Sequence, residues 1–232
     1  MQSRAGTLNS LPVIPVSAVL LDLDGTLVDT APDMAAALNQ LLAEENKAPM
    51  AYREVRPHVS QGAAGLLGLA WARQPDEEKF AALIQRFLEI YASLNGRQSV
   101  LFEGFAEVLD WLDSSGIAWG IVTNKPTWLS EPLLQHLGID QRSACLVCGD
   151  TLAQRKPHPA PLLHAAGLLD AKPQECVYVG DASRDMEAAE SANMAGIVAA
   201  YGYIPAGSDP SAWPAAATIE KPAELRGLIG LK

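Results

Sequence analysis

Short apolar runs alternate with amphipathic stretches through most of the chain. Residues typical of strands gather at 18–23, 117–123, 144–149, 175–180 and 195–200. Apolar residues recur with helical spacing at 103–115, 127–138, 159–168 and 183–193. Strands that alternate with helices predict an α/β fold, a mostly parallel sheet with helices on both faces. In such a sheet, ligands bind beyond the carboxyl ends of the strands.

The segment 31–98, which follows the first of these runs, has little strand character. Pro32 and Asp33 suit the first turn of a helix, because proline needs no N–H partner there and an acid lies near the positive end of the helix dipole. Apolar residues then recur at helical spacing through much of the segment. We therefore expect a small helical cap domain at 31–98, inserted into a core formed by 17–30 and 99–232.

Composition limits the class of protein and its surroundings. Residues 1–16 carry one arginine and no sustained apolar block, so we expect a flexible N-terminal tail rather than a signal peptide. No apolar stretch has the length of a membrane span, and three cysteines suit a reducing compartment, which predicts a cytoplasmic protein without a membrane partner. The formal charge of -10 disfavours nucleic acid as a partner. An anionic substrate would need a local group of cations or a metal ion.

Cys145 and Cys148 form a C-x-x-C pair, which can signal redox or zinc chemistry. They lie in an apolar run, and residues three apart on a strand face opposite sides of it. No second cysteine or histidine pair at zinc-binding spacing accompanies them in the sequence. We therefore expect two small, buried hydrophobic side chains.

Two acids end the first apolar run, and a glycine follows them. Asp22 and Asp24 are two residues apart, so on a strand their side chains point to one face and can converge beyond its end. An Asp-Gly pair is also ordinary turn chemistry, which explains Asp24 and Gly25 but leaves Asp22 with a desolvation cost. Paired acids at this place favour a metal-assisted attack on a phosphoryl group.

Further polar residues follow the later strands. Thr123 and Asn124 offer a hydroxyl and backbone N–H groups to phosphoryl oxygens, although a helix N-cap explains them equally well. Lys156, beside a proline, could neutralise a phosphate or could be a solvated surface residue. Asp181 ends its strand and Asp185 lies one helical turn further on, a spacing at which two acids repel each other unless a cation lies near them.

Together, these groups resemble the four ordered motifs of the haloacid dehalogenase superfamily. The matching runs are DLDGT at 22–26, Thr123-Asn124, Lys156-Pro157 and GDASRD at 180–185. The resemblance implies a Rossmann-like parallel sheet flanked by helices, with the helical cap of that family at 31–98. It also implies Mg²⁺ as the cofactor and a small phosphorylated metabolite as the partner, and it leaves the choice between monomer and homodimer open.

The same resemblance gives roles to the acids. Asp22 resembles the nucleophile, and Asp24 resembles the acid that protonates the leaving alcohol and the base that later activates water. Asp22, the Asp24 carbonyl and Asp181 would bind Mg²⁺. Asp185 would support the water around the metal or orient Lys156.

Substrate binding is assigned mainly to the second and third motifs. Thr123 and Asn124 would hold phosphoryl oxygens, and Lys156 would offset the negative charge gathered there. In the insertion, Gly62 begins a glycine-rich stretch that matches neither common phosphate-loop pattern. Close helix packing explains this stretch, and a lid loop that faces the substrate is the alternative, so Gly62 is a candidate substrate-binding residue. Arg184, inside the fourth motif, could pair with Asp150 or Asp181, but we expect it on a helix surface.

Within the superfamily, the likeness is closest to the phosphoglycolate phosphatase-like branch. It rests on Thr123 to Pro126, on Lys156 to Leu163 and on Tyr201 to Tyr203. A neighbouring branch hydrolyses N-acetylmuramic acid 6-phosphate, and the chain resembles it at Trp119 to Pro126, Arg142 to Ala144, Gly202 to Ile204 and Trp213. A sugar phosphomutase would share all the core motifs, so these motifs alone do not separate the three. A binding module without catalysis would lack an acid or the lysine. We expect a Mg²⁺-dependent phosphomonoester hydrolase that forms an aspartyl-phosphate, with 2-phosphoglycolate as its substrate.

Overall fold

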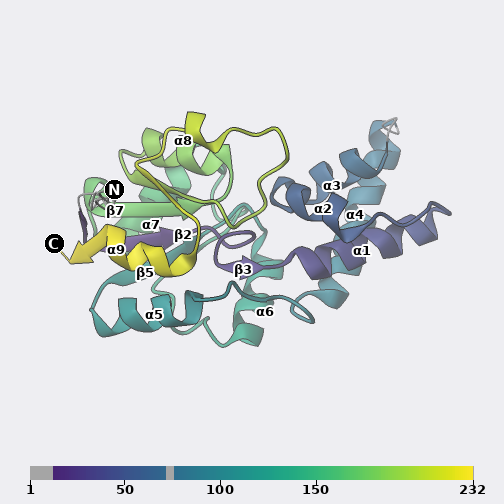
Figure 1. Ribbon diagram of the computed structural model, residues 1–232. Coiled ribbons are helices and arrows are strands. Elements are labelled where there is room, and N and C mark those ends of the chain that lie inside the picture. The colour runs from purple at the N-terminus through teal and green to yellow at the C-terminus, as the bar shows by residue number, and fades with distance from the viewer. Residues whose placement is uncertain (1–12, 72–75, 232) are drawn as a thin grey trace, which may run out of the picture.

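Figure 1 shows the computed structural model of the chain, which describes residues 13–71 and 76–231. A six-stranded sheet forms its centre, and every neighbouring pair of strands in that sheet is parallel. In spatial order, the strands are β6 (Leu146–Val147), β5 (Ala118–Val122), β2 (Ala18–Leu21), β7 (Cys176–Gly180), β8 (Ala195–Ala199) and β9 (Ala217–Ile219). Helices alternate with these strands along the chain, so the predicted α/β fold is confirmed.

Alternate residues of the central strand β2 face two different layers of helices. Val19 and Leu21 pack into one apolar layer, and Ala18 and Leu20 pack into the other. The helices of the first layer are α5 (Phe105–Ser114), α6 (Thr127–Leu137) and α9 (Leu225–Leu228), and those of the second are α7 (Ala160–Leu168) and α8 (Ser183–Ser191). Figure 1 shows α5 and α6 on one side of the sheet and α8 on the other. Because apolar layers cover both faces, polar chemistry falls to the strand ends.

A further group of helices lies beyond one end of the sheet (Figure 1). It comprises α1 (Ala31–Glu44), α2 (Tyr52–Val55), the 3-10 helix η1 (Arg56–Gln61), α3 (Gly62–Ala70) and α4 (Glu77–Leu94). Leu38 of α1 and Phe87 of α4 belong to a separate buried cluster, to which Leu129 and Tyr203 also contribute. We call residues 31–98 the helical segment.

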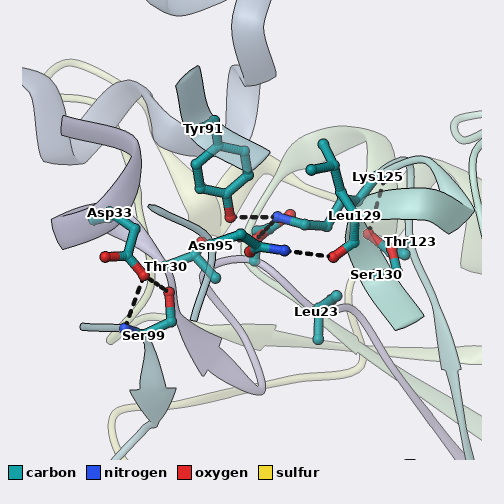
Figure 2. Close-up of polar contacts among 12 residues, drawn as sticks. Leu23, Thr30, Asp33, Tyr91, Asn95, Ser99, Thr123, Lys125, Leu129 and Ser130 are labelled. Atoms are coloured by element: carbon teal, nitrogen blue, oxygen red, sulfur yellow. Dashed lines mark hydrogen bonds and ion pairs between the residues drawn. The ribbon is translucent and has the colours of Figure 1, made fainter. Parts of the chain in front are cut away.

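A short ribbon joins the helical segment to the sheet. Strand β3 (Val28–Asp29) leads into the segment, and β4 (Val100–Leu101), which pairs with β3 in antiparallel fashion, leads out of it. The buried carboxylate of Asp33 accepts hydrogen bonds of 2.7–3.1 Å from the backbone N–H groups of Gly96, Gln98 and Ser99 and from the Ser99 hydroxyl. Figure 2 shows Asp33 and Ser99 in contact. The sequence explained Asp33 by the helix dipole alone. In the structure, Asp33 also binds the stretch where the chain leaves the helical segment to the start of that segment.

The remaining elements lie at the chain ends and in connections. They are β1 (Ile14–Val16), β10 (Ile229–Leu231), η2 (Pro173–Glu175), η3 (Pro210–Ala212) and η4 (Pro222–Glu224). Strand β1 pairs with β10 in parallel, so the prediction of a flexible tail is wrong for residues 14–16, while residues 1–12 lie outside the described part of the chain. Strand β9 was not predicted. None of the helices in the described ranges is both long and apolar enough to cross a membrane.

The C-x-x-C pair behaves as a pair of apolar side chains. Cys145 and Cys148 are free and buried, as predicted. Burial raises the pKa of the Cys148 thiol and raises that of Cys145 to about 11, so neither is an activated thiolate.

Candidate active site

Three carboxylates meet at the carboxyl ends of the central strands. Asp22 directly follows β2, Asp181 directly follows β7, and Asp185 lies in the first turn of α8. Each offers one carboxylate oxygen within 4.8 Å of the other two, and all three residues are buried. They meet because β2 and β7 are neighbours in the sheet although they are distant in the sequence. We refer to Asp22, Asp181 and Asp185 as the acid group.

The ammonium group of Lys156 lies against the acid group. Its Nζ is 2.9 Å from Asp22 Oδ1 and 2.8 Å from Asp185 Oδ1. It also donates to the Val122 carbonyl oxygen at 3.1 Å and to the Tyr178 hydroxyl at 2.6 Å. Only 1% of the Lys156 side chain is exposed, so it is not the solvated surface residue that the sequence left open.

Burial and repulsion between their negative charges raise the pKa values of two of these acids. Burial raises the pKa of Asp22 to about 6, with Lys156 opposing the rise and Asp185 adding to it. Burial also raises the pKa of Asp181 to about 7, and the negative charges of Asp22 and Asp185 contribute. A divalent cation would relieve this repulsion and would compete with protons for the same oxygens.

Asp181 provides the clearest test of whether the acid group suits a metal ion. Its Oδ1 is buried and has no hydrogen-bond partner among the described residues, which is costly for a carboxylate oxygen. Its Oδ2 accepts hydrogen bonds from the Ser60 hydroxyl at 2.6 Å and from the Tyr203 backbone N–H at 2.7 Å. Because Mg²⁺ takes oxygen ligands of this kind, the residues present fit that ion.

Two glycines allow the backbone to approach Asp181 closely. Gly25 has a φ of +86°, and a Cβ at that position would lie 2.1 Å from Asp181 Oδ2. A Cβ at Gly202 would lie 2.4 Å from Asp181 Cβ and from the Gly25 carbonyl oxygen. A side chain at either position would therefore push Asp181 out of the acid group.

Asp24 faces a different set of partners. Its Oδ1 accepts hydrogen bonds from the Thr30 hydroxyl at 2.7 Å and from Lys125 Nζ at 3.0 Å. Lys125 Nζ also lies 2.6 Å from the Tyr91 hydroxyl and 4.4 Å from the centroid of its ring. Burial lowers the pKa of Lys125, but Asp24 and Tyr91 outweigh burial and raise it overall, so Lys125 stays charged. The Asp24 carboxylate is not in the acid group found among the described residues, and the metal contact predicted for Asp24 was through its carbonyl.

Thr123 and Asn124 follow β5, the neighbour of β2 in the sheet. The Thr123 hydroxyl oxygen accepts the Lys125 backbone N–H at 3.1 Å, which leaves its own proton for donation to another group. The Asn124 carboxamide donates to the Lys156 carbonyl oxygen at 2.9 Å and accepts the Lys156 N–H at 3.1 Å. The Asn124 side chain is therefore engaged in positioning Lys156 rather than directed at a ligand.

The helical segment reaches the acid group through η1. Ser60 of η1 donates to Asp181, and Arg184 donates to the Ser60 carbonyl oxygen at 2.5 Å. The prediction that Arg184 lies on a helix surface is wrong, because its side chain is only partly exposed and its Nε is buried. Burial lowers the pKa of Arg184, but Asp185, Asp22 and then Asp181 raise it overall. Arg184 therefore adds a cation to the acid group.

Gly62 lies in the same turn of the helical segment as Ser60. It begins α3, with a φ of +68°, and no described atom outside its own neighbourhood lies within 4 Å of the place where a Cβ would be. The structure thus places Gly62 near the segment's contact with the acid group and leaves open space beside it.

Comparison with known families decides what kind of protein carries this site. The sequence model of one family, described as haloacid dehalogenase-like hydrolase, matches residues 19–199. This span includes all four strand-end motifs. The chain belongs to the haloacid dehalogenase-like hydrolases.

Three relatives of this haloacid dehalogenase-like hydrolase illustrate its neighbourhood. A phosphoglycolate phosphatase of Xanthomonas campestris pv. campestris is 45% identical over 90% of this chain and 94% of its own length. An N-acetylmuramic acid 6-phosphate phosphatase of Pseudomonas putida is 40% identical over 91% of this chain and 95% of its own length. The crystal structure of a predicted phosphoglycolate phosphatase from Haemophilus somnus superposes with a TM-score of 0.81 and 28% identity, covering 91% and 96%. The chain is therefore an enzyme similar to phosphoglycolate phosphatases.

Sequence reasoning gave no role to Lys125, Tyr91 or Tyr178 of this haloacid dehalogenase-like hydrolase. Charge alone could have pointed to Lys125, because the first motif has two acids, one buried and one half-buried, and Lys156 contacts only one of them. The two tyrosines fit the apolar patterns of a helix and of a strand. Nothing in those patterns indicates where the tyrosine hydroxyl groups lie.

Proposed function

We propose that this chain is a Mg²⁺-dependent phosphomonoester hydrolase that forms an aspartyl-phosphate on Asp22, with 2-phosphoglycolate as its substrate. The observation that carries the proposal is the meeting of Asp22, Asp181 and Asp185 around Lys156 at the strand ends. The relative named phosphoglycolate phosphatase, at 45% identity, supports this choice of substrate. The free, buried cysteines support a reducing, cytoplasmic setting.

The proposed reaction has two displacements at phosphorus. In the first, a carboxylate oxygen of Asp22 attacks in line, and the bond from phosphorus to the leaving oxygen breaks as the new O–P bond forms. Asp24 gives its proton to the leaving oxygen, which departs as the alcohol. In the second, Asp24 takes a proton from the water whose oxygen attacks phosphorus. The O–P bond to Asp22 then breaks, which frees inorganic phosphate and restores the carboxylate.

The other residues orient the nucleophile and stabilise the negative charge of the phosphoryl group in these steps. Lys156 holds the direction of Asp22 and offsets the charge of the phosphoryl oxygens. The hydroxyl of Thr123 and the backbone N–H groups beside it donate to those oxygens. The acid group and the Asp24 carbonyl would hold Mg²⁺, which supplies positive charge to the phosphoryl group when bound.

The helical segment, residues 31–98, acts in this proposal as a cap over a core formed by 17–30 and 99–232. Its own buried cluster and its two-strand connection to the sheet support this division. Ser60 and Gly62 stand in the turn that meets the acid group. Substrate choice would therefore be made by this turn, while the chemistry stays at the strand ends.

A second substrate deserves a direct test alongside the first. The 40% identical relative is named for N-acetylmuramic acid 6-phosphate, and it covers this chain as fully as the phosphoglycolate phosphatase does. Both substrates carry the same phosphomonoester group. The core site would treat them alike, and the cap would distinguish them.

The test is release of inorganic phosphate from 2-phosphoglycolate, N-acetylmuramic acid 6-phosphate and common sugar phosphates, with Mg²⁺ and with a chelator. We expect the highest kcat/KM for 2-phosphoglycolate and loss of activity without the metal. A higher kcat/KM for N-acetylmuramic acid 6-phosphate would replace the substrate and keep the mechanism. Conversion of a sugar phosphate to its isomer without release of phosphate would indicate a mutase and overturn the proposal.

A further inference from the structure

Each of the two acids in the first motif has a buried lysine of its own. Lys156 Nζ lies 2.9 Å from Asp22, and Lys125 Nζ lies 3.0 Å from Asp24. The exposed fractions of these lysine side chains are 1% and 4%. Lys156 also contacts the acid group through Asp185, whereas Lys125 contacts the helical segment. The two lysines therefore have different surroundings and different uses.

Lys125 meets the helical segment at Tyr91 of α4. Figure 2 shows the Tyr91 hydroxyl directed at the Lys125 ammonium. The oxygen and the nitrogen are 2.6 Å apart. The ammonium also lies 4.4 Å from the centroid of the Tyr91 ring, close enough for a cation–π contact. Tyr91 is itself packed in the buried cluster of the helical segment. Contacts run without a break from Asp24 through Lys125 to α4.

The Asp24 carboxylate is held from two sides. Lys125 approaches its Oδ1 from the end of β5, and the Thr30 hydroxyl approaches the same oxygen from the start of α1. Asp24 is the more accessible partner, with 18% of its side chain exposed. The buried lysine and threonine therefore determine which way the exposed part of the carboxyl group points.

We propose that Lys125 is the positioning residue for Asp24, and that through Tyr91 it makes the direction of that carboxyl group depend on the place of α4. The inference rests on the proposed function, because it needs Asp24 to exchange protons with the leaving group. With α4 against Lys125, the Asp24 carboxyl is aligned for this exchange. When α4 moves away, Lys125 loses a fixed contact and the alignment is lost, so proton transfer is coupled to coverage of the site.

The experiment compares two esters that differ in their need for a proton. The alkyl ester 2-phosphoglycolate has a poor leaving group, whereas 4-nitrophenyl phosphate releases a stable phenolate. Single-turnover release of the alcohol or phenol, with enzyme in excess and Mg²⁺ present, reports the first bond cleavage alone. For Lys125→Met, we expect a loss of about 10²-fold with the alkyl ester and of less than about 3-fold with the aryl ester.

Three further variants separate positioning from a general loss of structure. Tyr91→Phe keeps the ring and removes the hydroxyl, so the alkyl ester should lose about 5-fold and the aryl ester almost nothing. Lys125→Arg keeps the charge and should recover part of the alkyl-ester rate. Lys125→Met added to Asp24→Asn should cause no further loss, because the two residues act as a unit. Lys172→Met, at an exposed lysine, is the matched control.

Each other result has a definite meaning. Equal losses with both esters in a Lys125→Met protein that melts as the wild type does would overturn positioning, and so would full additivity with Asp24→Asn. If Lys125→Met does not fold, Tyr91→Phe decides by the same ratio of esters. A wild-type protein that releases phosphate from neither ester overturns the proposed function and this inference with it. Normal wild-type hydrolysis with unselective variants overturns this inference alone.

Discussion

The sheet and the helical segment contribute to the site by different physical means. The sheet supplies buried charges at strand ends, with Asp22, Asp181 and Lys156 as the main examples. The helical segment supplies neutral hydroxyl contacts, from Ser60 to Asp181 and from Tyr91 to Lys125. Charges at the strand ends determine which reaction is possible. In the proposed function, the hydroxyl contacts connect those charges with the cap, which would face the rest of the substrate.

This difference predicts two kinds of variant. A change at Asp22 or Lys156, the charges proposed to act on the phosphoryl group, should alter the chemical step for every phosphate ester, because that group is common to all of them. A change in the helical segment should alter binding or the ranking of esters and leave the phosphoryl chemistry in place. A variant in one region that gave the effect expected of the other region would contradict this comparison.

The largest effect is expected at Asp22. Asp22→Asn should lower phosphate release from every ester by at least about 10³-fold, because an amide cannot replace the attacking carboxylate. Phosphate assays at saturating substrate measure this loss, and Asp170→Asn, at an exposed position, is the control. If Asp22→Asn kept activity within about tenfold of the wild type, Asp22 would not be the nucleophile.

The next largest effect is expected at Lys156. Lys156→Met leaves Asp22 and Asp185 buried without their cation, so the free energy of unfolding in urea should fall by about 3–5 kcal/mol. The pKa of Asp22 is already raised to about 6, and without the lysine it should rise further. An acid whose folded-state pKa is raised stabilises the fold when protonated and ceases to do so as pH rises through that value. The deficit should therefore be larger at pH 8 than at pH 5, and an equal deficit at both values would contradict the buried ion pair.

Metal binding should give a smaller but measurable change in stability. The pKa values of Asp22 and Asp181 are raised to about 6 and about 7, so the metal-free protein loses stability as pH rises through this window. Mg²⁺ takes the place of the protons, so its effect should be larger at pH 8 than at pH 5.5. At about 100 times its Kd, the ion would add about 2.7 kcal/mol, or roughly 5–10 °C in Tm. Asp181→Asn should abolish the Mg²⁺-induced rise in Tm, and Ser60→Ala should preserve it. A rise in Tm that is the same at both pH values would contradict binding of Mg²⁺ at the acid group.

A weaker effect is expected where the helical segment joins the sheet. Asp33→Asn keeps one acceptor oxygen but loses the charge that the three backbone N–H groups share. Protection of these amides from hydrogen exchange should fall by about tenfold, equivalent to about 1.4 kcal/mol. The value of kcat should stay unchanged. Asp76→Asn, at the exposed N-cap of α4, is the control, since asparagine caps a helix as well as aspartate does.

The smallest effect is expected at Ser60. Ser60→Ala removes one hydroxyl hydrogen bond to Asp181, so KM should change by a few-fold, which is about 1 kcal/mol, and the ranking of esters should shift. The exposed Ser114→Ala is the matched control. A fall in kcat as large as that of Asp22→Asn would place Ser60 with the strand-end chemistry and erase the distinction between the two regions.

The site residues at the strand ends could be predicted because the apolar pattern of the sequence indicates where each strand ends and that the strands are parallel. Asp22 and Asp181 directly follow apolar runs, Lys156 lies in the loop after another, and parallel strands bring such positions to one edge. The same logic failed for Arg184, whose helical position looked exposed. Its burial depends on η1 of the helical segment, which packs against it from more than a hundred residues away. Contacts of this kind leave no local pattern.

The hydroxyl contacts could not be predicted for a related reason. A tyrosine such as Tyr91 satisfies the apolar spacing of α4 whether or not its hydroxyl finds a partner. For Asn124, the sequence assigned no partner to the side chain, and its carboxamide binds the Lys156 backbone, while the predicted contact of its backbone with a phosphate stays a prediction. Sequence pattern thus locates polar residues more reliably than it assigns their partners.

The ribbon of β3 and β4, with Asp33 across it, has a consequence for how such a protein could be rebuilt. The chain leaves and re-enters the core at adjacent points, so the sheet experiences the whole insertion as one surface loop. The entropy of closing a loop rises slowly with its length. A shorter or longer insertion grafted onto the same two strands should therefore leave the catalytic half folded. Substrate preference would then be an exchangeable module, provided that the new insertion keeps the contacts that Tyr91 and Ser60 make with the reaction centre.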